Sequence, residues 1–106
     1  MAYEVRILPS AEAELDVILA YLTGYSKDAA EAFLDAYENI LGLLKDGTLE
    51  LSLSRMPELA ELGYRTALVG DYVFLYCIEG EELLIAHFFH QRQDYAPIVF
   101  GKRRRL

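Results

Sequence analysis

The stretch that decides the fold is residues 64–95, YRTALVGDYVFLYCIEGEELLIAHFFHQRQDY. Three runs rich in β-forming residues follow one another there, separated by two short turn signals. The runs are 64–69, 72–78 and 83–89, and the turns are Gly70-Asp71 and Glu79-Gly80-Glu81-Glu82. The middle run carries no charge. The stretch therefore predicts three consecutive strands, with the middle one in the centre of a sheet.

A polar cluster follows the third run. It consists of His90, Arg92, Asp94 and Tyr95. Loops at strand ends commonly display reactive side chains on a rigid support. Three interpretations are open: the cluster does chemistry, it binds a ligand, or it only closes the sheet.

The first half of the chain predicts a strand and then two helices. Residues 2–8 alternate apolar and polar side chains, and Pro9 ends the run. Ser10 is the expected N-cap of a helix that stops at Gly24, and Ser26 starts a second helix that ends at Asp46-Gly47. The helical hairpin thus spans about 10–46. The tyrosine and leucine stripes on both helices are assigned to the core.

The remaining segments complete the expected topology. Residues 47–63 predict an irregular connection, with an extended piece at Leu49–Leu53 and one helical turn at 58–62. In the tail, Ile98–Phe100 are expected to pack on the body and 101–106 to be frayed. The order is β-α-α-β-β-β, and we expect one α+β domain over 1–106, with the hairpin packed on a small, largely antiparallel sheet.

Composition narrows the class of protein. The 106 residues carry a formal net charge of −7, and 54% of them are hydrophobic. Residues 1–63 hold 12 acids and 4 bases, whereas residues 64–106 hold 5 acids and 6 bases, so any phosphate contact is expected in the second half. No run predicts a membrane span or a signal peptide. The single cysteine, Cys77, is expected to be a small buried side chain. We expect a cytoplasmic protein with no metal site and no cofactor.

The element order and the motifs of residues 64–95 together resemble the RelE/ParE superfamily of type II toxin–antitoxin toxins, also known as plasmid-stabilisation proteins. The motifs are Tyr64-Arg65 before the Gly70-Asp71 hairpin, Tyr72 and Tyr76 in the central strand, and the string His90-Gln91-Arg92-Gln93-Asp94-Tyr95. The resemblance covers nearly the whole chain. It implies a prokaryotic growth inhibitor that a cognate antitoxin protein neutralises. RelE-like members cut mRNA on the ribosome, whereas ParE-like members poison DNA gyrase.

The residues favour the ParE-like branch. Metal-independent RNA cleavage needs a base, an acid and cations near the phosphate. The resemblance to RelE-like nucleases implies candidate catalytic residues at Arg65, His90, Arg92 and Tyr95. However, Val73 and Cys77 stand where a nuclease would place an arginine after a strand tyrosine. The connection at 47–63 offers Arg55 and no lysine.

Each candidate also has a structural interpretation. His90 can be a strand-end histidine bound to backbone, His87 a structural residue, and Arg92 and Asp94 an ion pair. Tyr95 can simply be packed. Three functional hypotheses therefore remain: a ParE-like toxin that binds a target such as DNA gyrase, a RelE-like mRNA endonuclease acting with the ribosome, and an inactive module that still binds an antitoxin.

Overall fold

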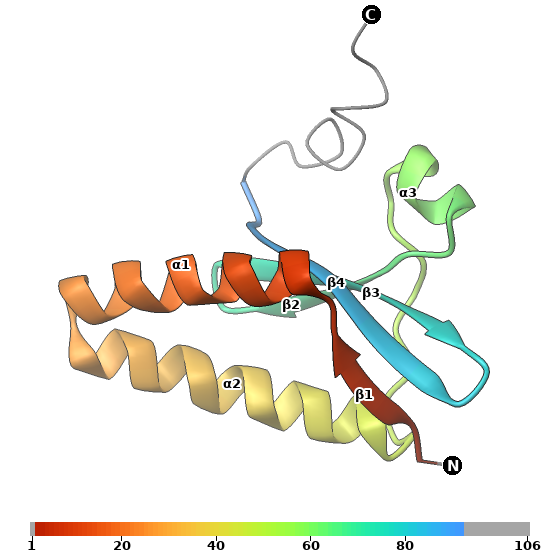
Figure 1. Cartoon of the computed structure of the whole chain (residues 1–106), viewed down its shortest axis with the longest axis horizontal. Helices are drawn as coiled ribbons and strands as arrows, with labels where there is room; N and C mark the ends of the chain where they lie inside the picture. Colours follow the sequence, from red (N-terminus) through yellow and green to blue (C-terminus); the bar gives the residue numbers. More distant parts are fainter. Residues whose placement is uncertain (1, 93–106) are drawn as a thin grey trace, which may run out of the picture.

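A computed structural model describes residues 2–92 of the chain. It contains four strands and three helices in the predicted order, with a short third helix inside the 47–63 connection (Figure 1). The elements are β1 (Glu4–Ile7), α1 (Pro9–Tyr25), α2 (Lys27–Lys45), α3 (Pro57–Glu61), β2 (Arg65–Val69), β3 (Tyr72–Glu79) and β4 (Glu82–His90). Among the described residues, no helix is both long and apolar enough to cross a membrane. The prediction for the tail, 96–106, falls outside the described residues.

The sheet has the strand order β1-β4-β3-β2. The three strands of the second half form an antiparallel meander, and β1 joins β4 in parallel. Both turns of the meander use a glycine in the left-handed region, Gly70 at φ 60° and Gly80 at φ 62°. A two-residue turn of this kind matches the twist of the flanking strands. The predicted α+β architecture is confirmed, and β3 and β4 are both interior strands.

A β-bulge lies in the middle of the β3–β4 pair. Leu75 pairs with His87, but the next residue, Tyr76, pairs with Ile85, so Ala86 is an extra residue in β4. A shift of one residue moves side chains to the opposite face of a sheet. The bulge therefore allows Ile85 and Phe88 to belong to the same core cluster. It also places His90 opposite Tyr72 at the end of the pair.

The helical hairpin covers one face of the sheet (Figure 1). Only Ser26 separates the two helices, and its hydroxyl accepts a hydrogen bond from the Ala29 N–H at 3.2 Å, so its predicted capping role is confirmed. The main core cluster joins α2 to the sheet through aromatic side chains, among them Phe33, Tyr37, Phe74 and Phe88.

The predicted start of α1 is wrong, because the N-cap lies two residues before Ser10 and Ser10 has a different role. Leu8 is the N-cap and Pro9 lies in the first turn, where its missing N–H costs nothing. Ser10 does not cap the helix, because its hydroxyl donates to the Ala86 carbonyl oxygen at 2.9 Å instead. The helix also continues past Gly24 to Tyr25.

The second face of the sheet carries a smaller apolar cluster under α3. Leu59 of this helix packs on Val73, Leu75 and Phe89, with Met56 and Tyr64 at the edge of the cluster. Leu53 forms an isolated bridge with Arg65, so the connection is extended before α3, as predicted. The centre of the sheet is thus apolar on both sides.

Candidate functional site: a groove between α1 and the end of β4

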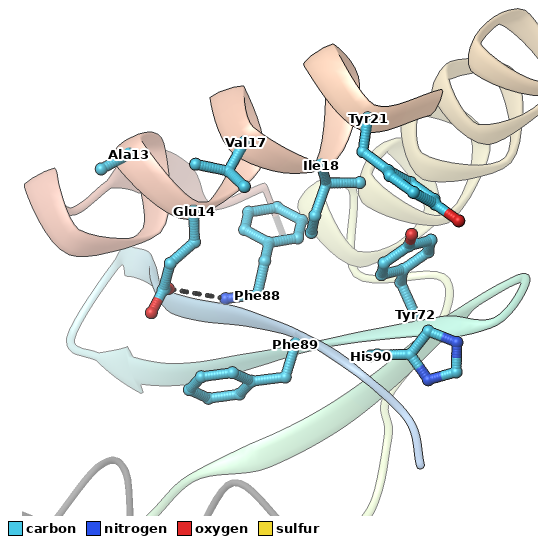
Figure 2. Close-up of a pocket in the computed structure, with 9 residues that line it drawn as sticks. All are labelled: Ala13, Glu14, Val17, Ile18, Tyr21, Tyr72, Phe88, Phe89 and His90. Atoms are coloured by element: carbon cyan, nitrogen blue, oxygen red, sulfur yellow. Dashed lines mark hydrogen bonds between the residues drawn. The ribbon is translucent and has the colours of Figure 1, made fainter. Parts of the chain in front are cut away.

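An open apolar groove of about 550 Å³ lies between α1 and the ends of β3 and β4 (Figure 2). Two exposed side chains of α1 form its outer wall, Val17 at 69% exposed and Tyr21 at 66%. The lining residues are Ala13, Glu14, Val17, Ile18 and Tyr21 of α1, and Tyr72, Phe88, Phe89 and His90 of the sheet. Large exposed apolar side chains beside a groove are typical of a surface that binds another protein.

The assignment of the whole tyrosine stripe of α1 to the core is therefore wrong. Tyr21 is exposed, and so is Tyr25, at 78%. The inward face of α1 is formed instead by Ala11 and Ile18, which are buried. Val17, Tyr21 and Tyr25 recur every four residues, so they form a second apolar stripe on the outside of the same helix. That repeat was the sequence signal that the single-face assignment missed.

Glu14 fixes α1 to the outer edge of β4. Its carboxylate accepts a hydrogen bond from the Phe88 N–H at 3.0 Å (dashed in Figure 2), and it lies 3.2 Å from Nδ1 of His87. The Ser10 hydroxyl donates to the Ala86 carbonyl oxygen in the same region. The Glu14 and Ser10 side chains thus satisfy backbone groups of β4 that lie beyond the end of β1. His87 thus has the structural contacts expected of it.

At the base of the groove, Tyr72 and His90 face each other across β3 and β4. Their rings meet edge to face with centroids 5.3 Å apart. Burial, followed by the neighbouring Tyr21 and Asp71, raises the pKa of Tyr72, so its phenol stays protonated at neutral pH. Figure 2 shows the Tyr21 and Tyr72 side chains converging at this end of the groove.

His90, the last residue of β4, is held by a contact with the backbone. Nδ1 of His90 accepts a hydrogen bond from the Arg92 N–H at 3.2 Å, which leaves Nε2 as the protonated nitrogen of the neutral ring. The Arg92 side chain is exposed. Tyr95, the fourth candidate catalytic residue, and Asp94 lie outside the described residues.

Arg65 lies elsewhere, near the other end of the sheet. It pairs with Tyr76, whereas His90 pairs with Tyr72 four residues away along β3. Nη1 of Arg65 donates to the carbonyl oxygen of Leu51 in the connection. Burial raises the pKa of Tyr76, and the Leu51 backbone and the Arg65 charge offset part of that rise. Arg65 is therefore part of a structural corner, not of the groove.

A second groove of about 500 Å³ lies on the other face of the sheet, between β2 and the segment before α3. It is more polar, and its charged lining residue is Arg55. The hydroxyl of Thr66, another lining residue, is buried without a hydrogen-bond partner. An RNA-cleaving site needs several cations around one phosphate, and the described residues that line this groove supply one.

Residues 2–92 contain no group of three or more histidine, cysteine or acidic side chains placed to hold a metal ion. Cys77, expected to be buried, is only partly so. Burial and, secondarily, Glu79 raise the pKa of its thiol, which keeps it a poor nucleophile at neutral pH.

Comparison with known proteins gives one family and several related folds. Residues 5–95 match the model of the ParE toxin of the type II toxin–antitoxin system parDE. A search of curated protein sequences found no match.

Three solved structures share the fold. One is from the chromosomal ParDE system of P. aeruginosa, at TM-score 0.64 and 19% identity over 84% of this chain and 96% of that chain. Another is a mutant of YafQ from E. coli, at TM-score 0.59 and 16% identity over 85% and 94%. A third is the protein HP0894 from Helicobacter pylori, at TM-score 0.54 and 17% identity over 88% and 98%. The chain therefore belongs to the ParE toxin family of type II toxin–antitoxin systems.

Proposed function

We propose that this ParE-type toxin stops growth by binding a cellular target, with DNA gyrase as the first target to test, and that a cognate antitoxin neutralises it in the cytoplasm. The observation that carries the proposal is the separation of the candidate catalytic residues. Arg65 is bound to Leu51 of the 47–63 connection, whereas His90 ends β4 and Arg92 follows it, at the other end of the sheet. What the described surface offers instead is an open apolar groove.

The α1 groove is the proposed antitoxin site. Antitoxin segments that fold on binding gain affinity by laying apolar side chains into such a groove. Val17 and Tyr21 are exposed without a partner element in the described part of the chain, so a bound segment would remove their apolar surface from water.

A growth assay tests the toxin function. Induced expression of the chain alone should stop growth, and co-expression with the antitoxin should restore it. If gyrase is the target, DNA breaks that depend on gyrase should appear while translated mRNA stays intact. Normal growth of the expressing host would contradict the toxin proposal for that host.

One matched pair of variants tests the groove. Val17→Asp places a charge at the outer wall, where we expect antitoxin binding to fall by about 100-fold, since a buried unpaired charge is costly. Leu62→Asp is the control, because Leu62 is also an exposed apolar side chain but lies after α3. Both exposed sites should change the folding free energy by only about 0.5 kcal/mol. Equal loss of binding in both variants would contradict the assignment.

The alternative is a RelE-like mRNA endonuclease that works on the ribosome. It is favoured by the proximity of His90 and Arg92, an acid–base group and a cation on one strand end. Primer extension on translated mRNA after induction separates the two functions, because only the nuclease leaves cuts. A chain that binds its antitoxin and causes no growth arrest would instead be the inactive module.

A further inference from the structure

We infer that the segment filling the α1 groove is cationic: an amphipathic antitoxin helix whose apolar side chains enter the groove while lysine or arginine side chains contact α1. This inference rests on the proposed function, in which the groove receives the antitoxin. Three features of the described surface support it: the uncompensated acids of α1, the acidic surroundings of the groove, and the exposed tyrosine rings beside it.

The charge of α1 has a single sign. Between Pro9 and Tyr25 the helix carries Glu12, Glu14 and Asp16 and no lysine or arginine. Glu12 and Asp16 are four residues apart and both exposed, so they repel each other on the helix surface. Neither forms an ion pair within residues 2–92, whereas Glu14 is engaged by His87. A cation from a partner would relieve this repulsion.

The described part of the chain as a whole also carries a net negative charge. Residues 2–92 carry 16 acidic and 6 basic side chains. Asp71 directly precedes Tyr72, a residue at the base of the groove, so a carboxylate also lies close to that end. Such a field attracts a cationic segment and raises its association rate, and it repels an anionic one.

The exposed aromatic rings favour the same ligand. Tyr21 and Tyr25 present their rings on the outside of α1, five and nine residues after Asp16. A guanidinium or ammonium group gains energy when it lies over the face of a tyrosine ring. Apolar side chains alone would use the groove, whereas a cationic segment would also gain from contact with the exposed tyrosine rings.

Two synthetic peptides test the sign of the charge. Both carry the same leucine face at helical spacing, and they differ only in flanking lysines or glutamates. Titration at low salt should show the lysine peptide binding about tenfold more tightly, with amide NMR shifts at Ala13, Val17 and Tyr21. Since salt screens exposed charges, the difference should shrink to about twofold near 0.5 M salt.

Paired charge variants locate the effect. Glu12→Gln with Asp16→Asn should abolish most of the tenfold preference. Glu31→Gln with Asp35→Asn is the matched control, because it removes two exposed acids four residues apart from α2 and should leave the preference intact. The inference is overturned if the glutamate peptide binds equally or better, if both variants behave alike, or if neither peptide binds. Growth arrest on expression, measured separately, decides the proposed function, because it does not depend on either peptide.

Discussion

Each end of β3 carries a tyrosine on the same face of the sheet, but the two side chains differ in their burial and contacts. Tyr76, beside Arg65, is fully buried, and the backbone of Leu51 in the 47–63 connection is a partner of both residues. Tyr72, beside His90, remains partly exposed at the base of the α1 groove. The difference arises from what covers each end. Polar groups that residues 2–92 cover become structural, and the end that these residues leave uncovered carries the groove.

Truncating the two tyrosines should give the largest difference between the ends. We expect Tyr76→Ala to lower the free energy of unfolding by about 3–5 kcal/mol, because it leaves a large cavity in a closed corner. Tyr72→Ala should cost roughly 1–2 kcal/mol, since its site is already open to solvent. Urea denaturation measures both. Equal losses would show that the two ends are equally closed.

Arg65 should also prove structural. Removing its guanidinium leaves the Leu51 carbonyl without its charged donor, so Arg65→Ala should cost about 1.5–3 kcal/mol of folding free energy. Arg55→Ala is the control, because Arg55 is exposed and should change stability by about 0.5 kcal/mol or less. Growth arrest by Arg65→Ala should fall only as the folded fraction falls. A stable Arg65→Ala variant that had lost its activity would instead point to chemistry at this residue.

Tyr37 packs against Phe88 of the groove, and its buried side chain should make the protein less stable at alkaline pH. Burial, and then Glu38, raises its pKa to about 12, and its hydroxyl has no hydrogen-bond partner. Above pH 10 the tyrosine ionises in the unfolded chain but stays neutral in the folded protein. The free energy of unfolding should therefore fall by about 2 kcal/mol between pH 10 and about pH 12. Tyr37→Phe should remove this part of the pH dependence. An unchanged alkaline profile in the Tyr37→Phe variant would contradict the assignment.

The fold was predictable from the sequence because its signals are local. Gly70 and Gly80 mark the two turns, and the strand between them is almost entirely apolar. Ser26 caps α2, as the sequence predicts. Each signal needs only a few neighbouring residues. The family resemblance depended on the spacing of these same elements, and the match over residues 5–95 agrees with it.

The groove was not predictable in the same way, because it depends on contacts between distant segments. Glu14 is one of three acids in α1, and nothing in the local sequence indicates that it binds the backbone of Phe88. The bulge at Ala86 decides which face His90 occupies, and no residue pattern in β4 announces it. The resemblance to RelE-like nucleases implied Arg65 and His90 as candidates for one catalytic site, but the register separates them along β3.

The smallest structural effect should come from Arg92, and it distinguishes binding from catalysis. Its exposed side chain makes no hydrogen bond or ion pair with the described residues, and only its backbone N–H contacts His90. Arg92→Ala should therefore change the folding free energy by about 0.5 kcal/mol or less. Under the target-binding proposal, growth arrest should persist in this variant and translated mRNA should remain uncut. If Arg92→Ala folds normally but no longer stops growth, while ribosome-dependent mRNA cuts made by the unmodified chain disappear, the open end of the sheet is a site of catalysis, and the endonuclease alternative replaces the proposal.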